Sequence, residues 1–270
     1  MNRPINILKA IINNPKNISR VFNSEEYYKT FISKKWKGFN EGLPVVDILD
    51  LFPEFEETVD PFSFVKGGSI RPIDLALLKA LARRYDACKY LEIGTLCGES
   101  AANVATIADE CVTIDLPPAE MREKMKRSDK FFEEGPGFFS KNLKNVKHIL
   151  HSSQTFDFST LGGKFDLIFI DGDHSYRSVK KDTENAFKIL RNSSSVIVWH
   201  DYRHNSGNIL WEVFAGILEG CPKEKIQNLY CVSDTICAVY IEGNFKKKDG
   251  IYPSEIPDKS FSIKISAHSL

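Results

Sequence analysis

The chain has 270 residues, of which 42% are hydrophobic and 27% are charged, so its composition is that of a globular protein rather than a disordered one. Its 36 Lys and Arg residues balance 36 Asp and Glu residues, and it lacks the basic excess typical of proteins that bind nucleic acid or anionic membranes. This length predicts one large domain, or one domain with an added subdomain.

Residues 1–65 are mixed in character, and we expect them to form an N-terminal cap on the main domain rather than a separate domain. The first residues contain no apolar stretch of the signal-peptide type. Three apolar residues between positions 5 and 12 recur at helical spacing and predict an amphipathic helix, and residues 25–36 predict another. Three prolines between residues 39 and 68 favour loops or extended connections in that stretch.

Residues 66–243 show a regular alternation of short apolar runs and amphipathic segments. The amphipathic spacing predicts helices at residues 72–81, 101–108, 176–190 and 209–217. The apolar runs predict strands at residues 89–93, 111–114, 146–150, 165–170 and 196–199. Alternation of this kind is typical of a mostly parallel sheet with helices on both faces.

Two further apolar runs close this domain. Residues 229–232 and 236–241 are separated by a short polar turn and predict an antiparallel hairpin. Together with the five earlier strands they predict a Rossmann-like α/β fold with a seven-stranded sheet. The longest apolar run, residues 236–241, is far too short to cross a bilayer, so we expect no membrane partner. Residues 244–270 have little periodicity, and we expect this C-terminal tail to lie over the surface.

An insert at residues 117–142 interrupts the alternation. It is charged, contains a Gly-Pro-Gly sequence and carries two pairs of phenylalanines. These features fit either a solvated helix followed by a loop or a lid that packs its aromatic rings over a pocket.

The six cysteines are scattered and include no C-x-x-C pair. Cys111 and Cys237 lie in apolar, strand-like runs, where a thiol behaves as a small hydrophobic group. A disulfide framework is unusual in a chain long enough to build a full core. We therefore expect reduced thiols and a cytoplasmic location.

Polar clusters follow the predicted strands, at the edge where open α/β sheets bind ligands. The first cluster runs from Glu92 to Ser100 between a strand and a helix, where Gly94 permits a tight turn and Gly98 allows close packing. A dinucleotide fingerprint would need glycine at the positions of Leu96 and Glu99, and a carboxylate at the latter position would repel a pyrophosphate. The loop therefore favours a ligand with a nucleoside but no phosphates.

Two more polar groups follow the second and third strands. Asp115 lies 21 residues after Gly94, where its carboxylate can accept both ribose hydroxyl protons, although it can also serve as a helix cap or turn residue. Ser153 and Gln154 follow the third strand and offer groups that can read an adenine edge. The same two residues are also ordinary loop residues.

Titratable side chains follow the fourth and fifth strands. The fourth strand is followed by Asp171-Gly-Asp-His174, and the fifth by His200-Asp201. If these strands are neighbours, Asp171, His200 and Asp201 come within reach of one cation. The alternative is structural: Asp173 or Ser175 caps the following helix, and His200 is a buried, hydrogen-bonded histidine.

These motifs resemble those of the class I S-adenosylmethionine-dependent methyltransferases. More narrowly, they are similar to the metal-assisted small-molecule O-methyltransferases of the catechol and macrolide-sugar types. The similarity lies in residues 90–101, 165–176 and 198–202 and covers the core from about residue 68 to residue 241. It does not extend to the cap, the insert or the tail.

The resemblance implies S-adenosylmethionine as cofactor. It implies that the methionine part is held by Glu92, Gly94 and Ser100, the ribose by Asp115 and the adenine by Ser153 and Gln154, with Gly98 and Asp171 completing the cofactor-binding residues.

The resemblance also implies that Asp171, His200 and Asp201 are the metal ligands and that His174 is the catalytic base. The family usually has an acidic residue at the position of His200, and histidine is less suited to Mg²⁺, which prefers oxygen ligands. The expected divalent cation is therefore Mg²⁺ or a softer ion, and the absence of any metal stays an alternative. The glycine pair usual before the fifth strand is Ser194-Ser195 in this chain.

The function implied by the resemblance is O-methylation of a hydroxyl on a small-molecule acceptor, such as a sugar or glycoside. The patterns leave the identity of the acceptor and the oligomeric state open, and an oligomer is compatible with them. We expect no nucleic-acid partner.

Three rival interpretations stay open. An NAD(P)-dependent oxidoreductase shares Gly94 and Asp115 but departs from its fingerprint at Leu96 and Glu99. A metal-dependent hydrolase uses the two titratable clusters but leaves the glycine loop without a purpose. A non-catalytic binding protein on a retained methyltransferase core is made less favourable by the presence of Glu92, Asp115 and His174.

Overall fold

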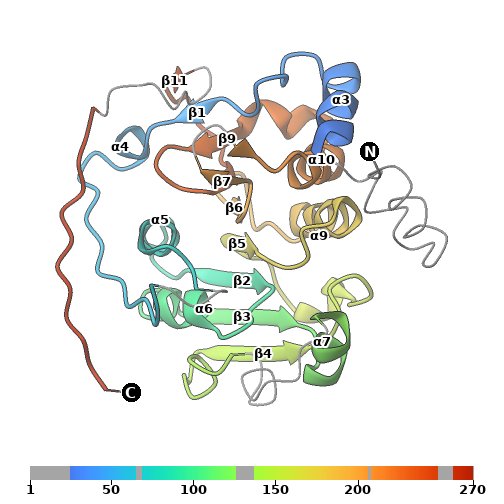
Figure 1. Cartoon of the computed structure of the whole chain (residues 1–270). Helices are drawn as coiled ribbons and strands as arrows, with labels where there is room; N and C mark the ends of the chain where they lie inside the picture. Colours follow the sequence, from blue (N-terminus) through green and yellow to red (C-terminus); the bar gives the residue numbers. More distant parts are fainter. Residues whose placement is uncertain (1–24, 65–68, 126–136, 206–207, 249–257, 270) are drawn as a thin grey trace, which may run out of the picture.

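The computed structural model describes residues 25–64, 69–125, 137–205, 208–248 and 258–269. The helix predicted between residues 5 and 12 lies outside them. A nine-stranded sheet forms the centre of the molecule, with the strand order β11-β1-β9-β10-β6-β5-β2-β3-β4 (Figure 1). Its strands are β1 Val45–Val46, β2 Lys89–Ile93, β3 Glu110–Asp115, β4 Val146–Leu150, β5 Leu167–Ile170, β6 Val196–Trp199, β9 Leu229–Val232, β10 Ala238–Tyr240 and β11 Lys247–Lys248.

All seven predicted strands are present in this sheet. The five strands β4, β3, β2, β5 and β6 are parallel, and β10 runs antiparallel to both β6 and β9, which confirms the predicted closing hairpin. The predicted α/β fold class is therefore confirmed. Strand β5 begins later than expected, because Phe165 forms only an isolated bridge with Leu190.

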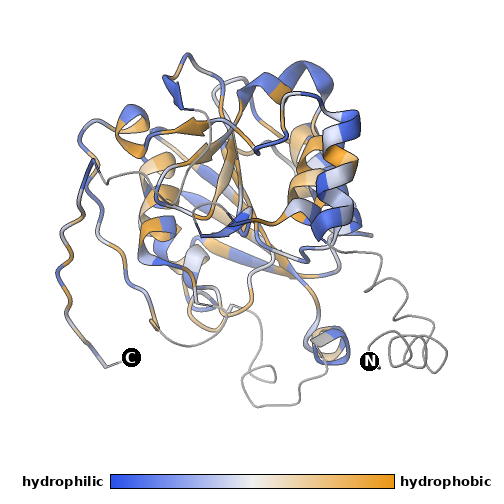
Figure 2. Ribbon diagram, turned by 45° about the horizontal axis from the view of Figure 1, so that its top comes forward, coloured by the Kyte–Doolittle hydropathy of each residue, from blue (hydrophilic) through white to orange (hydrophobic). Residues whose placement is uncertain are grey.

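Helices cover both faces of the sheet, and Figure 1 shows them gathered on its two sides. One core packs α3 Glu25–Lys35, α9 Tyr176–Lys188 and α10 Trp211–Gly220 against one face. A second core packs α5 Pro72–Ala82 and α6 Glu99–Val104 against the other. Figure 2 shows the result: the strands are mostly apolar, and the helices turn polar faces outward. Parallel strands buried on both faces read as continuous apolar runs for this reason.

The remaining described elements are short. They are α4 Ile48–Leu51, α7 Pro118–Met125, the 3₁₀ turns Phe158–Leu161 and Lys223–Asn228, and a small hairpin of β7 Arg203–Asn205 and β8 Asn208–Ile209. Ile209 was expected to begin a helix, but it lies in β8, and α10 begins only at Trp211. Among the described helices, none combines the length and the apolar character that a membrane crossing requires. None of the six cysteines, all of which lie in the described residues, forms a disulfide.

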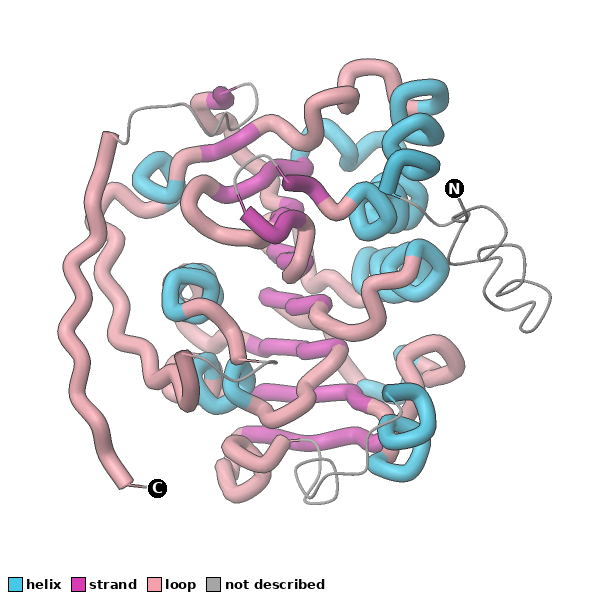
Figure 3. The backbone as a smooth tube through the Cα atoms, in the orientation of Figure 1, coloured by secondary structure: helices cyan, strands magenta, loops and turns pink. Residues whose placement is uncertain are grey.

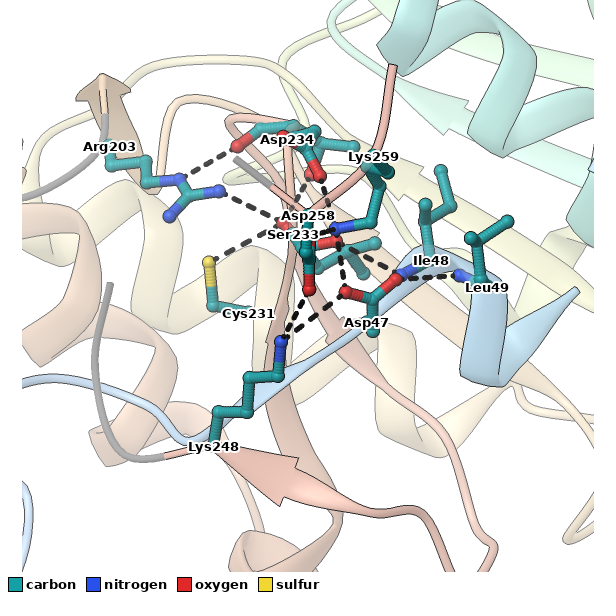
Figure 4. Close-up of polar contacts among 12 residues, drawn as sticks. Asp47, Ile48, Leu49, Arg203, Cys231, Ser233, Asp234, Lys248, Asp258 and Lys259 are labelled. Atoms are coloured by element: carbon teal, nitrogen blue, oxygen red, sulfur yellow. Dashed lines mark hydrogen bonds and ion pairs between the residues drawn. The ribbon is translucent and has the colours of Figure 1, made fainter. Parts of the chain in front are cut away.

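The segments expected as cap and tail both contribute strands to the sheet. Strand β1 pairs in parallel with β9, and β11 adds to β1 in antiparallel orientation. Ion pairs support this edge: the Lys259 Nζ lies 2.7 Å from Asp47 and 3.4 Å from Asp234, and the Lys248 Nζ lies 3.1 Å from Asp258 (Figure 4). Beyond Lys259 the tail runs as an exposed chain without regular secondary structure (Figure 3). The sequence therefore underestimated the sheet by two strands, since two residues are too few to show a period.

Candidate functional site

The five parallel strands end at the same edge of the sheet, which in Figure 1 is the side on which α7 lies. The predicted polar clusters follow these strand ends directly, so the fold gathers them at one edge. This is the edge at which open α/β sheets bind ligands.

The loop after β2 is closely packed on two sides. A Cβ placed on Gly94, whose φ is +89°, would lie 2.5 Å from the Cα of Gly172 and closer still to the Asp171 carbonyl. A Cβ on Gly98, whose φ is +77°, would lie 2.8 Å from the Cα of Gly137. Both positions require glycine, because a side chain would collide with backbone as well as strain the left-handed conformation. Leu96 has a φ of +46° without being glycine, so this loop carries local backbone strain.

Asp115 at the end of β3 holds this loop in place. Its Oδ2 accepts hydrogen bonds from the backbone N–H groups of Thr95 (2.9 Å) and Leu96 (2.6 Å), and its Oδ1 accepts one from the N–H of Leu116 (2.7 Å). Burial raises the pKa of the Asp115 carboxyl, and these three N–H groups act in the opposite direction. The carboxylate thus has a structural task that the sequence did not reveal.

Glu99 has a structural role that the sequence did not reveal. Its carboxylate is buried and accepts hydrogen bonds from the backbone N–H groups of Phe62 (2.7 Å) and Ile70 (2.9 Å) and from the Ser69 hydroxyl (3.1 Å). The residue thereby fastens the segment before α5 to α6. The expectation that its charge would repel a pyrophosphate stays a prediction.

The described parts of the insert contact the site. Its backbone N–H groups at Gly137 and Phe139 donate to the carbonyls of Leu96 (2.6 Å) and Cys97 (2.9 Å) of the glycine loop. The Phe139 ring stacks on Phe62 with a centroid separation of 3.6 Å and an interplanar angle of 6°. In addition, the Lys124 side chain of α7 forms an ion pair with Asp173 after β5. Residues 126–136 lie outside the described residues, so the lid hypothesis stays a prediction.

Glu92 is fully buried at the end of β2. Its Oε2 accepts a hydrogen bond of 2.6 Å from the Tyr90 hydroxyl. Burial raises the pKa of Glu92 to about 8, even though the hydroxyls of Ser100 and Tyr90 lower it. The carboxyl is therefore mainly protonated at neutral pH, so it can both donate and accept a hydrogen bond.

We expect a replacement of Glu92 by glutamine to flatten the pH dependence of folding stability. The folded pKa of about 8 lies above the ordinary 4.5, so the folded protein keeps a proton that the unfolded chain releases. The stability linked to this proton is complete below about pH 4.5 and is lost as the pH rises through about 8. Between these limits wild type should lose roughly 3–5 kcal/mol relative to Glu92→Gln.

Urea unfolding of both proteins across this pH range measures the difference. Glu110→Gln is the matched control, because Glu110 lies at the exposed start of the neighbouring strand. Parallel stability curves for wild type and Glu92→Gln would contradict the buried, protonated state of Glu92.

Ser153 and Gln154 lie together after β4 and contact α9. The Gln154 Nε2 donates to Ser153 Oγ (3.2 Å) and to Asp182 Oδ1 (3.0 Å). Asp182 is buried, and burial raises its pKa to about 7 against the effect of the Ser153 hydroxyl. Sequence reasoning missed Asp182, although its position between Val179 and Ala186 on the apolar stripe of the helix was a usable signal.

The titratable residues after β5 and β6 do come together. The His200 Nδ1 lies 3.1 Å from Asp171 Oδ1 and 3.5 Å from Asp201 Oδ2. The His174 Nε2 lies 3.1 Å from the same Asp201 oxygen. The predicted proximity of Asp171, His200 and Asp201 is therefore present, because β5 and β6 are adjacent strands, and His174 joins the cluster through Asp201.

The charges of this cluster depend on one another. Burial acts to lower the pKa of His200, but three surrounding carboxylates, those of Asp171, Asp201 and Asp74, raise it well above 6.5. The hydrogen bond to Asp201 raises the pKa of His174, with burial opposing it. Burial also opposes ionisation of Asp201, yet the two histidines hold its pKa well below the ordinary value. A cation bound at Nδ1 would replace a proton at that nitrogen.

The donor set of this cluster fits a divalent ion. Asp171, His200 and Asp201 each offer one ligand atom, and these atoms lie within 4.8 Å of one another. Two carboxylate oxygens and one imidazole nitrogen suit Mn²⁺, Co²⁺ or Zn²⁺ better than Mg²⁺, which favours oxygen alone. Asp74, which the sequence did not single out, lies behind His200 on α5.

Comparisons with known proteins match the central part of this chain. Residues 91–202, which include β2, β3, β4, β5, β6 and the strand-end clusters, match a family model described as a methyltransferase domain. The uncharacterized protein R132 of Acanthamoeba polyphaga mimivirus is 29% identical over 133 residues, which cover 47% of this chain and 58% of that protein. The chain thus spans little more than half the length of this relative.

Solved structures also show similarity to parts of this chain. Cofactor-bound Rv0187 from MTB is 25% identical, with a TM-score of 0.36 over 51% of this chain and 59% of the other. The N-methyltransferase NodS from Bradyrhizobium japonicum, in complex with S-adenosyl-L-homocysteine, is 16% identical, with a TM-score of 0.40 over 62% of this chain and 83% of the other.

Proposed function

We propose that the methyltransferase domain of this chain, residues 91–202, transfers the methyl group of S-adenosylmethionine to a hydroxyl of a small molecule, such as a sugar or glycoside. The observation that carries the proposal is the convergence, within this domain, of a closely packed glycine loop with the His174–Asp201 pair at one sheet edge. Bound S-adenosylmethionine supplies a sulfonium methyl group that is already an activated electrophile. The protein then has to align an oxygen nucleophile with it and remove a proton.

The proposed cofactor residues lie at or after the ends of β2, β3 and β4. Glu92, Gly94 and Ser100 would hold the amino-acid part, and Asp115 would bind the ribose. Because Oδ2 of Asp115 already accepts two N–H groups and Oδ1 only one, the free acceptor capacity for a ribose hydroxyl lies on Oδ1. Ser153 and Gln154, held beside Asp182, would contact the adenine.

His174 is the proposed general base. When its Nε2–H donates to Asp201, its Nδ1 is left as the proton acceptor. The side chain is 47% exposed, so an acceptor molecule can reach it. Alignment of the two reactants contributes roughly 7–11 kcal/mol, and a positioned base adds about 10²–10⁴-fold. Imidazole alone is a weak base toward an aliphatic hydroxyl, so acidification of that hydroxyl would help.

Asp171, His200 and Asp201 would hold a divalent ion for this purpose. Such an ion, when bound, lowers the pKa of a coordinated hydroxyl. The cysteines, which form no disulfide and are mostly buried, are compatible with the reducing cytoplasm in which we propose that the protein works.

A comparison of ligands tests the proposal directly. S-adenosylhomocysteine at about 100 times its Kd should raise the Tm by roughly 5–10 °C, while NAD⁺ at the same concentration should leave it unchanged. Stabilisation by NAD⁺ alone would favour the oxidoreductase interpretation and would overturn the methyltransferase one.

Removal of divalent ions tests the metal part separately. We expect chelation to reduce methyl transfer to an aliphatic hydroxyl by roughly 10²–10³-fold, with recovery on addition of Mn²⁺ or Co²⁺. The assay follows S-adenosylhomocysteine release. Activity indifferent to the chelator would remove the metal and leave methyl transfer standing.

A further inference from the structure

A buried carboxylate lies behind His200, on the side of the ring opposite to Asp171. Asp74 is 0% exposed in α5, and its Oδ1 accepts a hydrogen bond of 3.1 Å from the backbone N–H of Ile236. Its Oδ2 lies 3.4 Å from His200 Nε2. Within the described residues neither Oδ2 nor Nε2 has a hydrogen-bond partner of normal geometry. A carboxylate oxygen can only accept, and leaving it alone in a protein core is costly.

We propose that Asp74 is a positioning residue that keeps a proton on Nε2 of His200 and so turns Nδ1 toward Asp171 and Asp201. Only one part of this inference rests on the proposed function, namely that Nδ1 binds a cation. Nε2 is the ring nitrogen that faces Asp74, and Nδ1 faces the two aspartates at 3.1 and 3.5 Å. Histidine ligands commonly donate their second N–H to a carboxylate in this way, which fixes the ring and raises its basicity.

This arrangement gives the strand-end site a nitrogen ligand of fixed direction. An imidazole nitrogen beside two carboxylates selects a borderline divalent ion such as Co²⁺, Mn²⁺ or Zn²⁺ over Mg²⁺. Asp74 would therefore determine which cation the proposed methyltransferase uses, without touching the cation itself.

A second set of ligand atoms on the inner side competes with this assignment. Asp74, His200 and Cys237 also offer one ligand atom each within 4.8 Å of one another. Nε2 cannot both donate to Asp74 and bind an ion, so the two sites exclude each other. We favour the outer site because its aspartate side chains are 20% and 27% exposed and leave room for water or an acceptor, whereas Asp74 and Cys237 are fully buried.

Asp74→Asn is the decisive variant. The backbone N–H of Ile236 can only donate a hydrogen bond. The side-chain amide of the variant therefore keeps its oxygen toward Ile236 and presents its NH₂ group to His200. Two donors would then face each other, and the ring proton should leave Nε2 and stay on Nδ1, where it blocks a ligand bond. We expect the affinity for Co²⁺, measured by titration calorimetry on the full chain, to fall by about 10–100-fold.

Nitrogen NMR of the histidine side chains gives the readout that a merely structural role would not change. In metal-free wild type, His200 should show a proton on Nε2, and in Asp74→Asn that proton should be lost. Asp166→Asn is the matched control, because Asp166 is also buried but lies before β5, at the far edge of the sheet. It should change stability and leave both Co²⁺ affinity and the His200 spectrum as in wild type.

Several outcomes would overturn the inference. The first is an unprotonated Nε2 in wild type, a result that does not depend on whether a variant folds. The second is an Asp74→Asn protein whose His200 spectrum and Co²⁺ affinity are those of wild type. The third is Co²⁺ binding that is lost in Cys237→Ser but kept in Asp171→Asn. If wild type binds no Co²⁺ at all, the metal part of the proposed function fails. The role of Asp74 is then decided by the Nε2 signal alone, whose loss in Asp74→Asn supports it and whose retention refutes it.

Discussion

Replacement of His174 by alanine should reduce kcat for methyl transfer by about 10²–10⁴-fold and leave the affinity for S-adenosylhomocysteine nearly unchanged. The reason is geometric: the imidazole is held through Nε2 by Asp201 at 3.1 Å, and its other nitrogen is free to accept a proton. Single-turnover rates measure the chemical step, and calorimetry measures the affinity. His204→Ala serves as the control, because His204 is also exposed near the site, in β7.

The pH profile gives a second test of His174 as the proposed base. Only neutral His174 can accept a proton, and the hydrogen bond to Asp201 raises its pKa above the ordinary 6.5. The rate of wild type should therefore rise with pH through that raised pKa and level off above it, whereas the residual rate of His174→Ala should lack this limb. A large loss of cofactor affinity in the variant would instead mean that His174 has a structural role.

Replacement of Asp115 by alanine should weaken S-adenosylhomocysteine binding by roughly 10²–10⁴-fold. The side chain accepts three backbone N–H groups and, in our proposal, a ribose hydroxyl. A hydrogen bond to a charged group contributes about 1.5–3 kcal/mol, so loss of the ribose bond accounts for roughly 10–10²-fold, and the disturbed glycine loop accounts for the rest. The loop that contains Leu96 would lose its support together with the ribose contact.

Titration calorimetry with S-adenosylhomocysteine measures this effect. Asp109→Ala is the control, since Asp109 is exposed and lies just before the start of β3, at the opposite end of the strand. Asp115→Asn should fall between wild type and Asp115→Ala, because the amide keeps one acceptor oxygen. Wild-type affinity in Asp115→Ala would refute the ribose placement.

Local patterns were sufficient for the strands that form the site. Most of the seven predicted strands are short, mainly apolar runs, and such runs result from burial on both faces of a parallel sheet. The exception is β4, an edge strand that includes Lys147 and His148 and has no fully buried residue. Because parallel strands end at one edge, the residues that follow them, such as Gly94, Asp115, Asp171 and His200, could be expected to converge before any contact was known. Strand β1 was not predicted, because two valines are too few to show a period.

The sequence by itself determined the fold class and the chemical groups at the sheet edge, since both follow from periodicity and from the order of strands along the chain. Only the tertiary structure decided which partner each group has. Asp74 accepts from Ile236, which is 162 residues away, and Glu99 accepts from Phe62, 37 residues away. Such contacts depend on how helices and loops pack across the sheet, and the spacing of residues along the sequence does not indicate them. The bonds that Asp115 at the end of β3 accepts from the loop after β2 could not be predicted for the same reason.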